Sequence, residues 1–546
     1  MHKENIFYTI PAFLAESVAK FSDRPFLGFS DEEPLTFAQV DEKIGEVIVL
    51  LQKQGVEKGD KVAILSGNMP HWGIAYFAVL KMGAIGVPIL PDFSASEVVN
   101  VLTHSETKLI FVSDLQYPKI EKFESDYLLS VVKINDFSII HGLDCEKDTG
   151  ISSGFIVDED DLAAIIYTSG TTGNSKGVML THKNLAHNTV SASILQPVNT
   201  NDRFLSILPM SHTYENTLGL LLPMYCGASV WYLKKLPTPA VLIPAMQKIK
   251  PTMMLSVPLI IEKIYKFKIL PALKGKALIR MAYSVPVLRK MINRSAGKKL
   301  MHTFGNNLKF FGIGGSKLNP EVEAFLLEAR CFPYAIGYGL TETSPLVAGV
   351  NPSMARLQST GPSIEGVEIR LRDVDPHTGE GEIQVFGPNV MKGYYKDPEA
   401  TAKVFTEDGW FKTGDLGFID KDGYLFMRGR LKNVIIGSNG ENIYPEEIEA
   451  LINNFEFVSE SLVVDQKGKL VAFVHVNTEE ILKKYENMKE DVNAFVEAKI
   501  NDILSELKEA VNSRVNSYSA LKMVIAQSVP FEKTATQKIK RYKYTM

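Results

Sequence analysis

Residues 165–181 read IIYTSGTTGNSKGVMLT, which is an apolar run, a polar loop and a second apolar run. The two apolar runs predict buried strands on either side of the loop. The loop consists of Gly, Ser and Thr with one lysine, Lys176. Glycines let the backbone approach a phosphate, hydroxyls donate hydrogen bonds to its oxygens, and the lysine adds positive charge. The stretch is therefore typical of a phosphate-binding loop, although a flexible hairpin would explain a Ser/Thr/Gly run taken alone.

The loop differs from a Walker A loop, in which the lysine directly follows a glycine in the pattern GxxxxGK[ST]. Here Lys176 follows Ser175 and precedes Gly177. A P-loop phosphotransferase is therefore disfavoured.

Outward from this loop, the first ~430 residues alternate short apolar runs with helix-like periodicity. Four apolar runs predict buried strands: 62–66, 108–112, 162–167 and 308–313. Two amphipathic stretches predict helices: 95–106 and 320–329. This alternation predicts an α/β fold with largely parallel sheets and helices on their faces.

The pattern changes after about residue 360. Short strands separated by Gly, Asp and Pro predict a small antiparallel β-subdomain, with VEIRLRD, GEIQVFG and GYLFMRGR as its strands. A final α+β unit follows, with strands expected near 461–465 and 470–476. One long amphipathic helix is expected over roughly 479–512, because apolar residues recur on one side of it.

The composition is that of an ordinary globular protein with several structural units. The 546 residues are 45% hydrophobic and 22% charged, which excludes a disordered or fibrous chain. The 59 Lys and Arg against 63 Asp and Glu give a net charge of −4, so no nucleic-acid partner is expected. Three scattered cysteines and the lack of a signal-peptide pattern favour a cytoplasmic protein.

One segment departs from this charge balance. Residues 263–319 contain thirteen Lys and Arg and neither Asp nor Glu. Pro271, Gly275 and Pro286 are expected to divide the segment into short helices. A solvated basic face is one interpretation. The other is a platform for an anionic partner: a phospholipid surface in peripheral membrane contact, an acidic carrier protein or the phosphates of a cofactor.

Six motifs in order resemble those of the adenylate-forming superfamily, which includes acyl-CoA synthetases, nonribosomal peptide adenylation domains and firefly luciferase. The first is YTSGTTGNSKG (167–177). The others are GIGGSKLNPEV (312–322), IGYGLTETSP (336–345), GWFKTGDLGFIDKDGYLFMRGRLKNVI (409–435), SNGENIYPEEIE (438–449) and KTATQKIKR (533–541). The resemblance covers essentially the whole chain.

The resemblance implies a large N-terminal domain at 1–430 and a small mobile α+β domain at 431–546, with a hinge near Lys432. It also implies a two-step reaction. A carboxylate first displaces pyrophosphate from ATP, and a thiol then displaces AMP from the acyl-AMP. Oxygen chemistry of the luciferase type has no support in the motifs.

By the same resemblance, Thr168 and Glu342 would hold Mg²⁺, and Thr341 would hydrogen-bond the α-phosphate. Lys176 and the loop hydroxyls would hold the β- and γ-phosphates. The phosphate-loop residues in the ATP-binding set are Ser169, Gly170, Thr171, Thr172 and Gly173.

Adenosine would lie against a second set of residues. Gly314, Gly315 and Ser316 offer a surface without bulky side chains for a flat base, and Tyr338, which precedes Gly339, can stack on that base. Asp415 suits the two ribose hydroxyls because a carboxylate accepts hydrogen bonds at both oxygens. Arg430 would support the same ribose, and Lys432 follows in the nucleotide-binding set.

Lys538 matches the catalytic lysine of the family, which bridges the attacking carboxylate and the α-phosphate. The match has two departures: Gln537 replaces the usual glycine, and Phe531-Glu532 replace the usual Leu-Pro. After adenylation, the C-terminal domain is expected to rotate and withdraw Lys538. Gly437 and Gly440 would then leave room for the pantetheine arm of the thiol.

Residues 208–233 resemble the acyl-pocket region of fatty acyl-CoA synthetases, with His212 in the pocket and a Leu- and Gly-rich helix after it. A core histidine is the alternative for His212. We expect activation of a medium- or long-chain fatty acid with CoA as the thiol. Acyl carrier protein is the second candidate, and an inactive ATP-binding scaffold is the remaining alternative.

Overall fold

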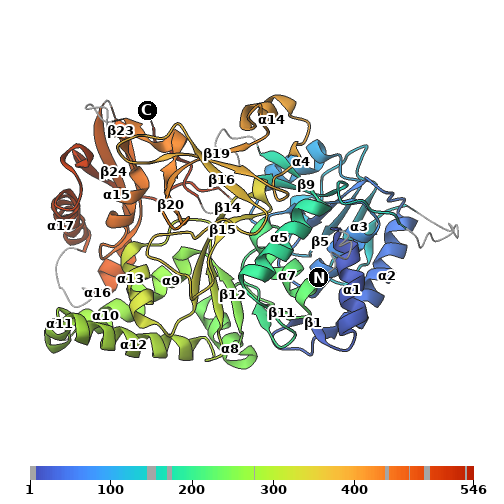
Figure 1. Ribbon diagram of the computed structural model, residues 1–546, viewed down its shortest axis with the longest axis horizontal. Helices are drawn as coiled ribbons and strands as arrows, with labels where there is room; N and C mark the ends of the chain where they lie inside the picture. The colour runs from blue at the N-terminus through green and yellow to red at the C-terminus, as the bar shows by residue number, and fades with distance from the viewer. Residues whose placement is uncertain are drawn as a thin grey trace.

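Two eight-stranded mixed sheets form the body of the protein in the computed structural model (Figure 1). The structure describes residues 8–143, 155–168, 175–275, 277–436, 442–466, 468–484, 492–534 and 538–545. The strands of the first sheet are, in spatial order, β18 (Gly393–Tyr394), β9 (Lys176–Thr181), β8 (Leu162–Thr168), β4 (Ile85–Ile89), β3 (Lys61–Leu65), β5 (Leu109–Val112), β6 (Ser130–Lys133) and β7 (Ile139–His141).

This first sheet contains three of the four buried strands that the apolar runs predict, as β3, β5 and β8. The pairs from β8 through β4, β3 and β5 to β6 are parallel, as expected. The stretch 165–181 contains the end of β8, the predicted loop and all of β9, and the two strands pair as an antiparallel hairpin. The two-residue strand β18 extends this hairpin by pairing Gly393 with Met179.

The second sheet has a parallel centre and antiparallel edges. Its strands are, in spatial order, β15 (Leu346–Gly349), β14 (Tyr334–Gly339), β13 (Phe310–Ile313), β12 (Met253–Ser256), β10 (Arg203–Leu205), β11 (Ser229–Tyr232), β1 (Pro25–Phe29) and β2 (Leu35–Thr36). The run predicted at 308–313 forms β13, so the expected α/β architecture is confirmed.

A shared apolar core joins the two sheets. It contains side chains from both sheets and from the helices α1 (Ile10–Phe21), α2 (Phe37–Lys53), α3 (Pro70–Lys81), α5 (His182–Leu195) and α7 (Leu222–Cys226). Helix α3 is buried along nearly its whole length, as its almost continuous apolar sequence requires. The outer faces are covered by α4 (Ala95–Ser105) on the first sheet, and by α8 (Pro239–Ile249), α9 (Pro258–Ile264), α12 (Pro286–Thr303) and α13 (Pro320–Ala329) on the second.

The predicted β-subdomain is a four-stranded antiparallel sheet. Its strands are, in spatial order, β16 (Glu368–Arg372), β17 (Gly381–Phe386), β19 (Phe411–Ile419) and β20 (Leu425–Arg430). The three segments with strand patterns form β16, β17 and β20. Helix α14 (Pro398–Val404) lies between β18 and β19 in the chain.

The C-terminal domain has its own sheet and core. The strands are β21 (Ile435–Ile436) with β22 (Asn442–Ile443), and β23 (Val458–Gln466), β24 (Lys469–Val476) and β25 (Met523–Gln527). The helices are α15 (Pro445–Ile452), α16 (Thr478–Lys484) and α17 (Val492–Asn512). The single helix expected over 479–512 is described as two helices, α16 and α17, and residues 485–491 between them lie outside the described residues.

The basic segment at 263–319 is divided only in part as predicted: the chain stays helical through Pro271, it is interrupted at Gly275 and before Pro286, and α12 is a long helix of 18 residues. After α9 come η3 (Tyr265–Ile269), α10 (Leu270–Lys274), α11 (Ala277–Tyr283) and α12. Pro286 lies in the first turn of α12, where the missing N–H costs no hydrogen bond. Among the helices that the structure describes, none is long and apolar enough to cross a bilayer.

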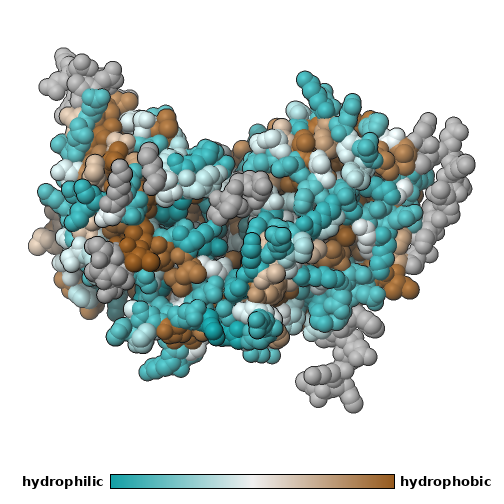
Figure 2. Space-filling model, turned by 90° about the horizontal axis from the view of Figure 1, so that it is seen from above, coloured by the Kyte–Doolittle hydropathy of each residue, from teal (hydrophilic) through white to brown (hydrophobic). Residues whose placement is uncertain are grey.

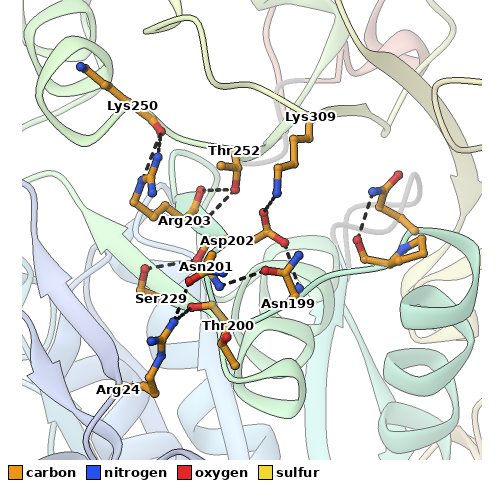
Figure 3. Close-up of polar contacts among 12 residues, drawn as sticks. Arg24, Asn199, Thr200, Asn201, Asp202, Arg203, Ser229, Lys250, Thr252 and Lys309 are labelled. Carbon is orange, nitrogen blue, oxygen red and sulfur yellow. Dashed lines mark hydrogen bonds and ion pairs between the residues drawn. The ribbon is translucent and has the colours of Figure 1, made fainter.

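A polar cluster around Asp202 fixes the amino edge of the second sheet (Figure 3). The Asp202 side chain is almost fully buried and forms an ion pair with Lys309 at 2.8 Å, directly before β13. The Asp202 backbone oxygen accepts from the Ser229 N–H at 3.1 Å, and Thr252 accepts from the Arg203 N–H at 2.9 Å. These contacts align the starts of β10 to β13, so the opposite ends of the same strands are held in register.

Candidate active site

Part of the set predicted to bind adenosine and the α-phosphate lies at the carboxyl ends of β13 and β14. Gly314–Ser316 continue from β13, Tyr338 and Gly339 end β14, and Thr341 and Glu342 lie in the short helix η4 (Thr341–Thr343). Ligands of parallel α/β sheets bind at this edge, because loops from neighbouring strands converge there. From above, the molecule is hollowed between the half with the C-terminal domain and the half with the N-terminal helices (Figure 2).

Thr168 and Lys176 face each other across the β8–β9 hairpin, at the two ends of the phosphate-type loop. Five predicted residues of this loop lie outside the described residues: Ser169, Gly170, Thr171, Thr172 and Gly173. The two glycines predicted for the thiol tunnel, Gly437 and Gly440, also lie outside them.

Tyr394 connects Lys176 to Glu342. Its hydroxyl donates a hydrogen bond to Glu342 Oε1 at 2.9 Å, and the Lys176 ammonium lies 4.6 Å from the centre of its ring. Burial, followed by the charge of Glu342, raises the pKa of the Tyr394 phenol, so the hydroxyl remains a donor at neutral pH. Tyr394 lies in the Gly-Tyr-Tyr run at 393–395, and no sequence pattern marks it as a site residue.

Asp415 and Arg430 are register partners on β19 and β20. Arg430 Nε lies 2.7 Å from Asp415 Oδ1, and the Tyr338 hydroxyl donates to Oδ2 at 2.7 Å. Burial raises the pKa of Asp415, and the neighbouring Arg430 counteracts part of that rise. Each carboxylate oxygen has a second acceptor position, so two hydroxyls could still bind.

Lys538 lies within electrostatic reach of three predicted site residues. Desolvation, and then repulsion from Arg430, lowers the pKa of the Lys538 ammonium, while Asp415 and Glu342 favour its charged form. Lys538 is exposed to solvent. The structure therefore brings Lys538, from the C-terminal domain, to the residues at the carboxyl edge of the N-terminal sheet.

His212 lies close enough to Lys538 for the lysine charge to affect it. Burial, followed by Lys538, lowers the pKa of the His212 imidazole to about 4, so the ring is neutral at pH 7. The Tyr214 N–H donates to His212 Nδ1 at 3.2 Å, which leaves the ring proton on Nε2. His212 is also the N-cap of α6 (Thr213–Glu215), the start of the Leu- and Gly-rich segment.

That segment is buried but not uniformly apolar. The predicted apolar residues Leu218, Leu220, Leu221 and Leu222 are all buried, within η2 (Asn216–Leu221) and α7. Glu215 is buried beside them, and burial raises the pKa of its carboxyl to about 8. A glutamate in a polar run is usually exposed, so no sequence pattern predicts this burial.

At two of the predicted glycines, the surrounding structure leaves little room for a side chain. A Cβ at Gly314 would lie 3.2 Å from the ring of Tyr214, which packs over the loop after β13. A Cβ at Gly339 would lie 1.8 Å from the backbone oxygen of Pro345, so no other residue fits this turn. Tyr214 is therefore a further residue of the site, next to the predicted base-binding surface.

Lys432 lies in η5 (Leu431–Asn433), directly after β20 and before the C-terminal domain. Desolvation and Arg430 lower the pKa of its ammonium.

Polar contacts also join the C-terminal domain to the N-terminal domain. Lys266 Nζ donates to the Val458 backbone oxygen at 2.7 Å, and Asn319 donates to the Asn454 side chain at 2.7 Å.

Among the described residues, no group of three or more His, Cys, Asp and Glu side chains could hold a metal ion. Mg²⁺ is commonly held by one or two protein oxygens together with substrate phosphates. Glu342 fits this donor type, since Tyr394 holds its carboxylate beside Lys176.

Comparison with known proteins agrees with this fold and site. The family of AMP-binding enzymes matches residues 14–395, and the chain belongs to that family. It is 30% identical over 529 residues to the long-chain-fatty-acid–CoA ligase heimdall of Drosophila melanogaster, covering 86% of this chain and 76% of that protein. It is also 29% identical to the chloroplastic long-chain-fatty-acid–[acyl-carrier-protein] ligase AEE15 of Arabidopsis thaliana, covering 91% of this chain and 80% of that protein.

Among solved structures, the ATP-bound RpMatB-BxBclM chimera B1 aligns with a TM-score of 0.77 and 25% identity. The alignment covers 99% of this chain and 98% of the chimera. The chain thus has the adenylate-forming fold over its whole length, and it is an acyl-activating ligase of the AMP-binding family.

Proposed function

We propose that the protein activates a medium- or long-chain fatty acid with ATP and transfers the acyl group to CoA. The observation that carries this proposal is that Lys538 lies within electrostatic reach of Asp415, Arg430, Glu342 and His212. A lysine near the carboxylate predicted to bind ribose and near a neutral histidine suits a reaction in which a carboxylate must approach the phosphates of ATP.

In the first half-reaction, a carboxylate oxygen of the acid attacks the α-phosphorus of ATP, and the bond to pyrophosphate breaks. Lys538 would contact both the attacking oxygen and the α-phosphate, where negative charge concentrates in the transition state. Thr341 would donate to the same phosphate. The proton on His212 Nε2 would serve as a donor to the second carboxylate oxygen, because Nδ1 already accepts from the backbone.

Residues on the opposite side would bind the nucleotide. Asp415 would accept from the ribose hydroxyls while Arg430 and Tyr338 hold its carboxylate in place. Lys176 and the loop at 169–173 would hold the β- and γ-phosphates. Mg²⁺, with Thr168 and Glu342 as its protein ligands, would neutralise phosphate charge when bound.

The second half-reaction joins the acyl carbon to the sulfur of CoA and releases AMP. For this step, we propose that the C-terminal domain turns about Lys432 and withdraws Lys538. The contacts between domains support such a motion, because those of Lys266 and Asn319 are hydrogen bonds rather than a shared apolar core. Gly437 and Gly440 would then face the thiol.

The fatty acid is supported by the buried leucines after His212 and by the likeness to the Drosophila ligase. Acyl carrier protein is the alternative thiol, and the likeness to the Arabidopsis ligase named for that acceptor favours it as the second candidate.

Mass spectrometry would test both candidates in one reaction with Mg·ATP, hexadecanoate, CoA and holo-acyl carrier protein. Hexadecanoyl-CoA is the expected product. If acyl carrier protein thioester is the only thioester formed, the acceptor is acyl carrier protein rather than CoA. Acetate or an aromatic acid with a higher kcat/KM than hexadecanoate would overturn the fatty-acid assignment, and the absence of AMP with every acid would support the inactive scaffold.

A further inference from the structure

One glutamate carboxylate binds side chains from both domains. Glu380 precedes β17 in the N-terminal domain, and its Oε1 lies 2.6 Å from Arg428 Nε on β20 of the same domain. Its Oε2 accepts a hydrogen bond at 2.5 Å from the hydroxyl of Tyr444, which directly precedes α15 in the C-terminal domain. The Glu380 side chain is only 11% exposed, so water could not fully replace a lost partner. The contact therefore joins the two domains through a largely buried charge.

A second carboxylate reinforces this contact one turn further along α15. Glu447 Oε1 lies 3.4 Å from Arg428 Nη1 and 3.6 Å from Lys317 Nζ, in the loop after β13. Both cations belong to the N-terminal domain. The first turn of α15 thus contacts β20 and the loop after β13, and Figure 1 shows α15 next to β20.

The same helix also holds the segment that carries Lys538. Glu449, on α15, is buried, and its Oε2 lies 2.5 Å from Arg541 Nη2. Arg541 follows Lys538 by three residues and also donates through Nη1 to the Val463 backbone oxygen on β23, at 3.3 Å. Burial raises the pKa of the Glu449 carboxyl, and the charge of Arg541 opposes that rise. Helix α15 therefore links the contact between the domains, at its first turn, to the segment of the catalytic lysine.

We propose that Tyr444 is a positioning residue, whose bond to Glu380 holds Lys538 in the orientation that adenylation needs. The proposal rests on the proposed two-step function, in which the C-terminal domain turns about Lys432. Glu380 precedes that hinge in the chain and Tyr444 follows it, so the turn must break their hydrogen bond. Removing the bond shifts the population away from the adenylation orientation and leaves the turned orientation unaffected. The first half-reaction then slows while the second does not.

Tyr444→Phe tests this separation of the half-reactions. Pyrophosphate exchange into ATP with hexadecanoate should fall by about 10- to 150-fold, the equilibrium factor for one hydrogen bond to a charged group. Formation of hexadecanoyl-CoA from added hexadecanoyl-AMP and CoA should stay at the wild-type rate or rise. The matched control is Tyr518→Phe, because the Tyr518 hydroxyl bonds within the C-terminal domain, to Asn516 at 2.7 Å. This control should leave both half-reactions unchanged.

A double-mutant cycle tests whether Tyr444 acts through Glu380. Glu380→Ala removes the acceptor and should also lower pyrophosphate exchange. The double variant Glu380→Ala/Tyr444→Phe should lose no more than Glu380→Ala alone, because both changes break the same bond.

Energy transfer between two dyes measures the domain orientation without any catalysis. The dyes would be attached to cysteines introduced at Leu115 and Met523, which are 83% and 50% exposed in the N- and C-terminal domains, after the native cysteines are replaced by alanine. In the protein without substrates, Tyr444→Phe should change the transfer efficiency and Tyr518→Phe should not. A wild-type protein that forms no acyl-AMP would refute the proposed function, and the dye measurement would still test the position of the C-terminal domain.

Four results would overturn the proposal. They are a wild-type rate of pyrophosphate exchange in Tyr444→Phe, equal losses in both half-reactions, additive losses in the double variant, and an unchanged transfer efficiency. Equal losses would assign Tyr444 to the stability of the fold, and additive losses would show that it acts through another partner.

Discussion

Removing the hydroxyl of Tyr394 should weaken the use of MgATP without removing the phosphate-loop lysine. In Tyr394→Phe, Glu342 loses a 2.9 Å hydrogen bond, and the ring under Lys176 remains. A hydrogen bond to a charged group contributes about 1.5 to 3 kcal/mol. The expected loss in kcat/KM for MgATP is therefore about 10- to 150-fold at 1.36 kcal/mol per factor of ten.

Pyrophosphate exchange into ATP at varied Mg²⁺ would measure this loss, with KM for the fatty acid expected to change little. Tyr394→Leu also removes the contact between Lys176 and the ring, which is worth about 0.5 to 2 kcal/mol, or a further 2- to 30-fold. Tyr395→Phe is the matched control, because the neighbouring ring packs against His104 at 5.8 Å instead.

The reasoning is refuted if Tyr394→Phe stays within twofold of the wild type, or if Tyr395→Phe loses as much. A rise in the KM for the acid alone would place Tyr394 in the acyl site rather than beside the metal ligand.

Three further changes have distinct outcomes. Lys538→Ala should lower acyl-AMP formation by about 10²- to 10³-fold, measured by pyrophosphate release, while added acyl-AMP still gives thioester. Lys432→Pro should keep pyrophosphate release and impair thioester formation, because it stiffens the proposed hinge. Glu215→Gln should stabilise the fold above pH 5, in thermal unfolding series at pH 5, 6, 7 and 8. The Glu215 carboxyl has its pKa raised to about 8 when folded, so wild-type stability falls by about 1.4 kcal/mol per pH unit between its unfolded pKa and 8.

Each of these changes has a result that contradicts it. Equal losses in both half-reactions would remove the assigned role of Lys538. Unchanged thioester turnover in Lys432→Pro would exclude a hinge at that residue. A difference between Glu215→Gln and the wild type that is the same at pH 5 and pH 8 would show that the Glu215 carboxyl does not stay protonated in the folded protein.

The order of strands and helices could be predicted because it depends on local patterns. The runs at 62–66 and 108–112 are continuous and apolar, as a strand buried on both faces requires, and they form β3 and β5. The helix expected over 479–512 agrees with α16 and α17 at its two ends, and whether it is one helix stays a prediction because residues 485–491 lie outside the described part of the chain.

Contacts within the candidate site were only partly predictable. Motifs selected Asp415, Arg430 and Lys538, which the structure brings close together. Tyr394 and Tyr214 could not be selected, because their partners are distant in the chain and a two-residue strand such as β18 has no periodicity. Burial of Glu215 is likewise a property of the tertiary packing around it.

The pairing of β18 with β9 also has a consequence for synthesis of the chain. Met179 and its partner Gly393 are roughly 200 residues apart, which is about 10 to 40 s of translation at 5 to 20 residues per second. During that time, one edge of β9 has no strand to pair with, and unpaired edges are sites of aggregation. Strand β9 is therefore a part of this protein that would gain from a chaperone that shields its free edge until Gly393 has emerged.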